Sequence, residues 1–481
     1  MKLCSVFTVV AACTTGQRWS LAAVAAGQGP FTLQVPEDGI VGTYYRTVIR
    51  DGPQPQHSVL WGDDIIDGTA ASIGIGIGGS EAAAGTCTAA AAAHTARMLA
   101  QTELLISGRV YKPREDADEA TPRAAWCRSD APAATPLPLL RSISNLRNRK
   151  AHPPAAEGIT LVTQLSLERL PMLERQCRVW AGYPLAAAVY IPLIQGKVAS
   201  GDDPRLNGSS LDAALVPLLK LHAAAEAGTG CILDVEIVTE AHCDAASAAL
   251  YPTNAVRNRA LRLVGTEAVL LLDVDFLPSS SLLERAADAR HRAALMALLQ
   301  QPVALVLPAF ETAGKKRADA ELAARVVTAG KEAVLSALDS GALHPFHSGH
   351  YTRGHLPTDF RRWAVQTQPY NCTFTRGFEP YILLHRARVP WYDERFRGYF
   401  INKLAHAAHL HYLGTRFLVH PDAFVVHQPH KTAASKGQAR AQGLNHMYTR
   451  LFSRALGQMQ VGNYLPYVAD PHLCYTSRLW D

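Results

Sequence analysis

The chain after residue 155 alternates short apolar segments with longer amphipathic ones, and this alternation constrains the fold more than any other feature. The expected strands are 159–164, 186–191, 231–238, 268–272, 304–308, 381–385 and 423–427, and the expected helices are 167–180, 211–225 and 255–264. Strands and helices that alternate at these lengths predict an α/β fold whose parallel sheet is covered by helices on both faces. The uninterrupted apolar character of the strands fits such two-sided burial.

The first 155 residues have a different character, since they are rich in Ala, Gly and Pro and carry little regular periodicity. Met1 and Lys2 precede an apolar run over residues 3–13, which resembles a signal peptide or a shortened membrane anchor. The run is shorter than the roughly 20 residues of a normal membrane span, and a plain terminal strand or helix is the alternative. We expect an N-terminal region over 1–155 with a possible membrane association, and a domain over 156–470.

Composition excludes several classes of protein. With 48% apolar residues, 18% charged residues and a formal net charge of +6, the chain is neither disordered nor strongly basic. Because no dense Lys/Arg stripe with interleaved aromatic residues occurs, we expect no nucleic-acid partner. The nine cysteines form no C-x-x-C pair, which argues against a zinc ribbon and leaves disulfide pairing open.

The most informative segment is an apolar strand that runs directly into two acids, Asp273 and Asp275. On extended backbone, side chains two residues apart point the same way, and carboxylates so close repel each other unless a positive charge lies between them. Ligands of open α/β sheets bind at the carboxyl ends of strands, where a divalent cation held by oxygen ligands also binds a diphosphate. The alternative is a helix-capping Asp beside a salt-bridged partner.

Two further segments carry side chains that suit the same ligand. Asn254, Arg257 and Asn258 have helical offsets 0, 3 and 4 and share one helix face, which suits a uracil, ribose or phosphate. The alternative is an ordinary polar helix face. His427 ends another apolar strand, and an imidazole beside carboxylates is a plausible Mn²⁺ ligand, although a lone strand-end histidine is more often structural.

The order of these motifs along the chain resembles glycosyltransferase family 49. The matching segments are 159–166, 251–260, 270–279, 305–311, 354–360, 378–381, 392–399, 402–403 and 424–427. The resemblance extends from about residue 156 to residue 430. It implies a GT-A type nucleotide-sugar-binding fold with a mixed, mostly parallel sheet, a UDP-sugar donor that is typically UDP-glucuronate, and inversion at the anomeric carbon.

The resemblance also implies roles for particular residues. Mn²⁺ or Mg²⁺ would be held by Asp273, Asp275 and His427, and the nucleotide-sugar would be bound by Gln164, Asn254, Arg257, Asn258 and Asp273. The candidate general bases are Asp393, Glu394 and Glu379, all in matching segments, and Asp393 is the favoured one. The alternative for Asp393 is a local salt-bridge cluster with Arg395. Arg376, Arg395 and Lys403 are candidate partners for a glucuronate carboxylate.

One position departs from the family pattern. Where the family usually has GYG or GFG, this chain has Phe400 after Gly398 and Tyr399, which narrows the backbone conformations available there. Several functions therefore remain open: transfer of glucuronate, transfer of xylose or N-acetylglucosamine, a non-catalytic protein that binds sugar nucleotides or glycans, and a metal-dependent hydrolase. The resemblance implies a glycan acceptor and a location in the Golgi lumen, as a type II membrane protein or within the secretory pathway.

Overall fold

The computed structural model describes residues 140–194, 208–228, 230–242, 251–314, 316–398, 401–430 and 444–469. The chain divides into two compact units, one of residues 1–109 and 437–451 and one of residues 110–436 and 452–481. The strands and the candidate site described below belong to the second unit. The signal or anchor expected over residues 3–13 and the departure at Phe400 lie outside the described residues.

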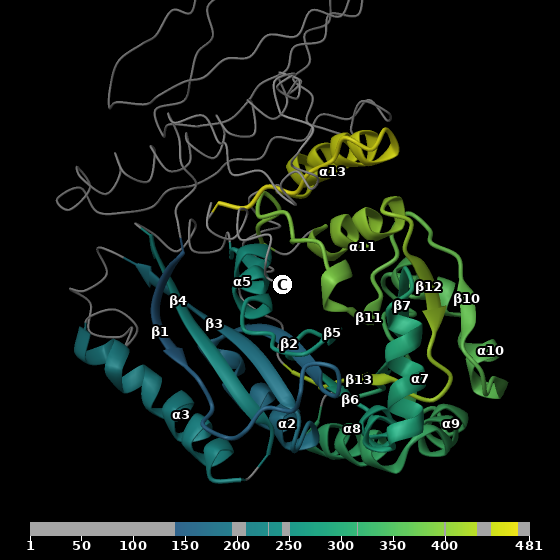
Figure 1. The fold of residues 1–481 in the computed structure, drawn as a ribbon, viewed down its shortest axis with the longest axis horizontal. Coiled ribbons are helices and arrows are strands. Elements are labelled where there is room, and N and C mark those ends of the chain that lie inside the picture. Colours follow the sequence, from purple (N-terminus) through teal and green to yellow (C-terminus); the bar gives the residue numbers. More distant parts are fainter. Residues whose placement is uncertain are drawn as a thin grey trace, which may run out of the picture. The chain divides into compact units, whose positions relative to one another are not determined.

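The strands of the described residues form two sheets (Figure 1). The first has nine strands in the order β1-β4-β3-β2-β5-β11-β7-β12-β10, and the second has four in the order β6-β13-β8-β9. Their bounds are β1 Arg141–Leu146, β2 Ile159–Ser166, β3 Pro184–Ile194, β4 Ile232–His242, β5 Ala268–Leu271, β6 Phe276–Pro278, β7 Val303–Leu307, β8 Ala309–Thr312, β9 Leu343–Pro345, β10 Tyr370–Cys372, β11 Tyr381–His385, β12 Arg416–Val419 and β13 Val425–His427.

Helices connect most of these strands. The α-helices are α2 Leu170–Val179, α3 Gly208–Glu226, α5 Thr253–Leu261, α6 Ser281–Ala287, α7 Ala289–Leu299, α8 Arg317–Ala329, α9 Lys331–Asp339, α10 Phe360–Val365, α11 Asn402–Tyr412 and α13 Leu444–Gln460. Short 3-10 turns occur at Leu167–Arg169, Thr352–Gly354, Leu356–Thr358 and Arg386–Arg388. In α2, a proline lies in the first turn, where backbone N–H groups have no partner within the helix, so its missing N–H costs no helical hydrogen bond.

The nine-stranded sheet is mixed. Strands β2, β3, β4 and β5 pair in parallel, and β12 pairs in parallel with β7. Strand β11 runs antiparallel between β5 and β7, and the two edge strands, β1 and β10, also pair antiparallel. The expected mixed α/β architecture is confirmed, with parallel pairs as numerous as antiparallel ones in this sheet.

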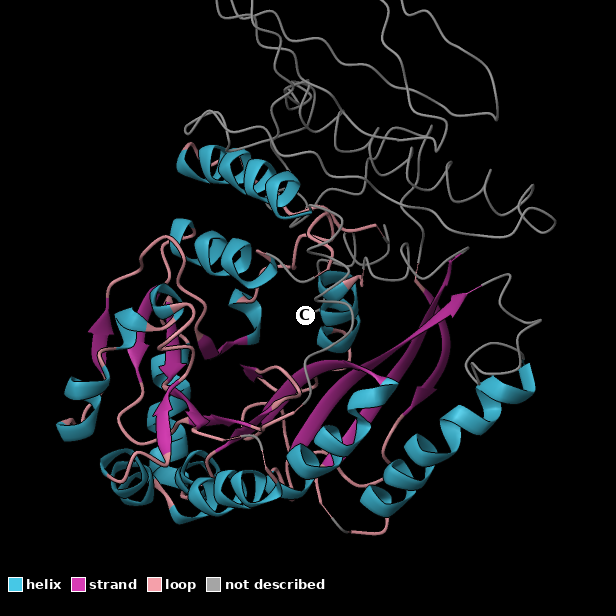
Figure 2. Ribbon diagram, turned by 180° about the vertical axis from the view of Figure 1, so that it is seen from behind, coloured by secondary structure: helices cyan, strands magenta, loops and turns pink. Residues whose placement is uncertain are grey.

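Both faces of the parallel part are covered by helices, as the apolar strands predicted. Alternate residues of β3 point to opposite faces. Ala186 and Ala188 pack in one core with α5, whereas Leu185 and Ala187 pack in another with α2 and α3. Figure 1 shows α3 alongside strands β1, β3 and β4, and Figure 2 shows the same strands, in magenta, from behind. A sheet buried in this way exposes its functional side chains at the strand ends.

Most predicted elements from residue 155 onward are confirmed within a few residues, including the strands β2, β3, β4, β5, β7, β11 and β13 and the helices α2, α3 and α5. Strand β1, which lies before residue 155 and pairs with β4, was not predicted. Strands β6, β8, β9, β10 and β12, of three or four residues each, were also not predicted, because segments this short carry too few residues for a periodic pattern. The domain boundary near residue 155 stays a proposal.

Cys177 and Cys231 form a disulfide that joins the end of α2 to the start of β4. Both cysteines are buried, and the cross-link closes a segment of 54 residues. The described part of the chain therefore contains one of the pairings that the scattered cysteines left open, and this pairing bears on the compartment discussed below.

None of the helices within the described ranges combines the length and the apolar character needed to cross a bilayer.

Candidate functional site

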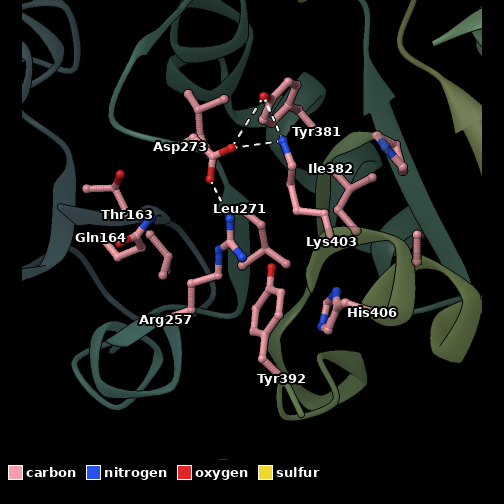
Figure 3. A pocket seen from close by; sticks show the side chains of 14 residues that line it. Thr163, Gln164, Arg257, Leu271, Asp273, Tyr381, Ile382, Tyr392, Lys403 and His406 are labelled. Carbon is pink, nitrogen blue, oxygen red and sulfur yellow. Dashed lines mark hydrogen bonds and ion pairs between the residues drawn. The ribbon is translucent and has the colours of Figure 1, made fainter. Parts of the chain in front are cut away.

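A pocket opens at the carboxyl ends of β2 and β5, where the fold places its ligand-binding edge. Its polar lining comes from distant parts of the chain and comprises Thr163, Gln164, Arg257, Asp273, Tyr381, Tyr392, Lys403 and His406. Figure 3 shows Asp273, Arg257, Tyr381 and Lys403 converging on one another. Of the residues expected to bind the nucleotide-sugar, Gln164, Arg257 and Asp273 line this pocket.

The carboxylate of Asp273 is held between two cations. The Arg257 guanidinium donates to Oδ1 at 2.7 Å, and the Lys403 ammonium donates to Oδ2 at 2.9 Å. Lys403 also donates to the Tyr381 hydroxyl at 3.0 Å. Although burial raises the pKa of Asp273, the Lys403 and Arg257 charges outweigh it and hold that pKa below its usual value. Asp273 is therefore an anion in a pocket that is otherwise positive.

Asp275 faces a second cluster, made with two histidines. Its Oδ2 lies 3.6 Å from Nε2 of His427 and 3.1 Å from Nε2 of His430, and the two imidazole nitrogens are 3.2 Å apart. The side chains are 18–28% exposed, so solvent reaches them. The Oδ1 atom of Asp275 is buried and has no hydrogen-bond partner. Burial raises the pKa of Asp275, but hydrogen bonds from His427 and His430 lower it well below its usual value.

Backbone pairing brings these distant residues together. Strand β13 pairs antiparallel with β6, so that His427 lies opposite Phe276, the residue after Asp275. The N–H of Gln428 donates to the carbonyl of Asp275 at 2.6 Å and extends this pairing to the turn. The ring of Phe276 contacts the His427 imidazole edge-on with centroids 5.0 Å apart, which fixes the orientation of that imidazole.

The acid doublet lies at a turn and not on the extended backbone that was expected, and its two carboxylates contact different groups. Strand β5 ends at Leu271, β6 begins at Phe276, and the N–H of Phe276 donates to the carbonyl of Asp273 at 3.1 Å. A turn separates the directions of side chains that an extended strand would align. The structure thus brings Asp275 and His427 together, adds His430, and places Asp273 with Arg257 and Lys403.

Asn254 and Asn258, both expected to contact the nucleotide, are buried in α5 and bond to the chain itself. The Asn254 amide donates to the carbonyl of Asp393 at 2.8 Å. The Asn258 amide donates to the Tyr392 carbonyl and to Glu394, and its oxygen accepts from the Tyr392 N–H, all at 2.9 Å. These two residues anchor the 392–394 segment, and among the three residues of this helix face Arg257 lines the pocket.

This anchoring predicts a measurable effect on stability. We expect Asn258→Ala to lower the free energy of unfolding by about 2 kcal/mol, because it leaves buried partners of three hydrogen bonds unpaired. Urea denaturation of the variant and the parent chain measures the difference. The exposed Asn145 on β1 provides the control, since Asn145→Ala should change stability by less than about 0.5 kcal/mol. Equal effects of the two substitutions would contradict the anchoring role.

Two of the three candidate bases are committed to internal contacts. Both oxygens of Asp393 accept from Arg395, and Oδ2 also accepts from the Tyr464 hydroxyl at 2.7 Å. The salt-bridge cluster considered as the alternative for Asp393 is therefore present. Glu394 accepts from Asn258 at one oxygen and from the N–H of Ala469 at the other, at 2.9 Å each. Both side chains are buried.

Glu379 differs from these two, because its side chain is 21% exposed and lies beside Lys403, which lines the pocket. The Lys403 ammonium lies 3.9 Å from its carboxylate. Burial raises the pKa of Glu379, and the opposing Lys403 charge does not cancel that rise. A partly solvated carboxylate with a raised pKa, next to a lysine that lines the pocket, is suited to accept a proton.

Some site residues were not assigned roles from the sequence. Tyr381 and Asn402 lay in motif segments but had no predicted function, and His430 lies three residues after His427, just beyond the matching segment 424–427. Asn402 accepts from Arg257 at 2.8 Å and so helps to position the guanidinium. A strand-end histidine followed by a second one was the available signal for His430. His406 and His409 are buried in α11, and His406 also lines the pocket.

Comparisons with known proteins bear on the family. The family model described as "Glycosyl-transferase for dystroglycan" matches residues 219–462. Xylosyl- and glucuronyltransferase LARGE2 of Rattus norvegicus is 34% identical over 278 residues, covering 58% of this chain and 35% of the relative. Xylosyl- and glucuronyltransferase LARGE1 of Homo sapiens is 32% identical over 279 residues, covering 58% and 32%. The chain spans about a third of the length of these curated relatives.

Among solved structures, S. aureus TarS 1–349 is 12% identical with a TM-score of 0.30, over 62% of this chain and 72% of that chain. The family model, by contrast, matches in sequence over more than half of the 481 residues, including the acid doublet and both histidines of the cluster. The chain therefore belongs to glycosyltransferase family 49.

Proposed function

We propose that this chain is a metal-dependent inverting glycosyltransferase that moves a sugar, with glucuronate from UDP-glucuronate as the first candidate, to a glycan hydroxyl. The observation that carries the proposal is the divided acid doublet. Asp275 adjoins two imidazoles, and Asp273 adjoins two cations in a neighbouring pocket at the same sheet edge. This arrangement provides separate places for a divalent ion and for an anionic, hydroxyl-rich donor.

The side chains at Asp275 suit a divalent ion such as Mn²⁺. Carboxylate and imidazole ligands are a common donor set for such ions. The Oδ1 atom of Asp275 is buried without a hydrogen-bond partner, and a bound cation would compensate its negative charge. Asp275 and His427, both predicted from the sequence, would hold the ion. When bound, it would neutralise charge on a UDP leaving group.

The chain's own residues would divide the remaining work. Arg257 and Lys403 keep Asp273 ionised, so that its carboxylate accepts hydrogen bonds from hydroxyl groups of the donor. Glu379 would take the proton of the acceptor hydroxyl. In the same step the oxygen of that hydroxyl would bond to the anomeric carbon, and the bond from that carbon to the phosphate oxygen would break. This displacement inverts the configuration at the anomeric carbon.

Lys403 supports an acidic sugar as the donor. Its ammonium lies over the ring of Tyr381 at 4.5 Å and is 20% exposed at the pocket. A cation placed there favours a donor with a carboxylate. The relatives are named both xylosyl- and glucuronyltransferases, which supports xylose as the alternative donor sugar. N-Acetylglucosamine transfer and a binding protein without activity are the remaining alternatives.

The compartment is proposed from two features. A buried disulfide is typical of proteins that fold in an oxidising compartment. Asn371, in the sequon Asn371-Cys372-Thr373, is exposed on β10. Together with the family resemblance, these features support a location in the Golgi lumen. A shift in the mass of the cell-expressed chain on glycosidase treatment would test its entry into the secretory pathway.

A panel of UDP-sugars tests the donor. We expect UDP release in the presence of a glycan acceptor to be fastest with UDP-glucuronate. Lys403→Met should raise KM for UDP-glucuronate at least about tenfold more than KM for UDP-xylose, because only glucuronate has a carboxylate that pairs with the Lys403 ammonium. An equal increase in KM for both donors would show that Lys403 acts only through Asp273 and does not bind the sugar carboxylate. Absence of UDP release with every donor, in a folded protein with Mn²⁺, would reject transfer.

A further inference from the structure

Family resemblance and residue spacing both pointed to Asp273 as a ligand of the ion, but the geometry places it elsewhere. Each oxygen of Asp273 already accepts a hydrogen bond from a fixed cation, at 2.7 Å from Arg257 and 2.9 Å from Lys403. A bond to the ion would require Asp273 to give up at least one of these partly buried ion pairs, or would bring two more positive groups close to the ion. Both outcomes are unfavourable.

His430 is positioned to take that place. Among the described residues, Asp275, His427 and His430 are the carboxylate and imidazole groups whose ligand atoms all lie within 4.8 Å of one another. Their separations are 3.1, 3.2 and 3.6 Å. Two atoms bound about 2.1 Å from one ion are roughly 3.0 Å apart at a right angle and roughly 3.4 Å apart at the tetrahedral angle. The observed triangle therefore matches three ligands of a single ion.

The surroundings hold this triangle in place. The His427 ring packs against Phe276 and against Phe346, with centroids 5.0 and 5.1 Å apart. The Asp275 backbone is fixed by the N–H of Gln428, and the Gln428 amide donates to the neighbouring carbonyl of Val274 at 3.1 Å. A ligand set that is held before the ion arrives loses little conformational freedom when the ion binds.

The chemistry of these ligands favours some ions over others. Mg²⁺ prefers oxygen ligands and keeps several of its waters, whereas imidazole nitrogen suits Mn²⁺ and the later transition metals. We propose that the metal site of this chain is Asp275, His427 and His430, without a direct bond from Asp273, and that its two imidazoles select a transition-metal ion such as Mn²⁺ over Mg²⁺. The catalytic role of the ion rests on the proposed function, whereas its binding to these three residues does not.

Titration of Mn²⁺ into the chelator-stripped chain of 481 residues tests this without donor or acceptor. The EPR signal of free Mn²⁺ falls as the ion binds. We expect His430→Ala to weaken Mn²⁺ binding by about tenfold to a hundredfold. Pulsed EPR of the bound ion should show couplings to two imidazole nitrogens in the parent chain and to one in the variant. The exposed His350 is the matched control, and His350→Ala should leave both measurements unchanged.

His430→Asp provides the conservative variant. It replaces a nitrogen ligand with an oxygen ligand, so Mn²⁺ should still bind, while the ratio of the Mg²⁺ to the Mn²⁺ dissociation constant falls at least about tenfold. Unchanged Mn²⁺ affinity in His430→Ala, or couplings to fewer than two imidazoles in the parent chain, would overturn the inference. Mn²⁺ binding that depends on His430 in a chain that transfers no sugar would instead reject the proposed function and leave the metal site standing.

Discussion

Asp275→Asn should lower the rate of sugar transfer at saturating donor by at least about a hundredfold, because it removes the charged ligand at the ion that stabilises the leaving diphosphate. The substitution keeps the size of the side chain and leaves β6 and β13 paired through their backbones. The rate of UDP release in the presence of acceptor, measured across a range of Mn²⁺ concentrations, checks the expectation. Excess Mn²⁺ should not restore the parent rate.

The control for this variant is Asp339→Asn, at an exposed carboxylate at the end of α9. It should transfer sugar at the parent rate. If Asp275→Asn retained more than about a tenth of the parent rate with saturating donor, the ion would not act through Asp275. The separate contacts of Asp273 and Asp275 would then have no role in catalysis.

Glu379→Gln should lower kcat by about a hundredfold to ten-thousandfold with little change in the KM of the donor, since it removes the proposed general base and keeps the shape of the side chain. The pH profile adds a second readout. A base works only when deprotonated, and burial raises the pKa of Glu379 above its usual value. The parent rate should therefore fall as pH falls through a value above the ordinary glutamate range near 4.3, and this acidic limb should be absent in Glu379→Gln.

Two further variants separate this role from other effects. Glu332→Gln, at an exposed glutamate of α9, should leave both the rate and the acidic limb unchanged. Glu394→Gln changes a carboxylate committed to Asn258 and Ala469, so it should lower stability and keep the acidic limb. An acidic limb that disappears in Glu394→Gln and persists in Glu379→Gln would assign the base to the 392–394 segment instead.

The α/β class and the elements from β2 to β5 were predictable from the sequence, because buried strands are continuous apolar runs and amphipathic helices have a clear period. Strand β5 and helix α2 are examples. Helices α6 to α10 were not predicted. Strand β11 was predicted, but not its antiparallel position between β5 and β7, since strand order depends on contacts between distant segments. The alternation of apolar and polar residues along a strand does not indicate which other strand pairs with it.

The candidate site was predictable in its residue types and less so in its contacts. The doublet of Asp273 and Asp275 was found, but the turn that separates their carboxylates was not, because three apolar residues follow it and continue the strand pattern. The polar face of α5 was found as well. Whether Asn258 faces a ligand or the neighbouring 392–394 segment depends on a packing partner 134 residues away in sequence. Such partners appear only in three dimensions.

The most direct test of the central claim is transfer of labelled glucuronate or xylose from its UDP-sugar to a glycan acceptor by the chelator-stripped chain, with Mn²⁺ restored in steps. The account predicts no labelled glycan without the ion, formation of product that saturates with Mn²⁺, and an inverted anomeric linkage in the product. Equal transfer with and without Mn²⁺, or retention of the donor's anomeric configuration, would contradict it.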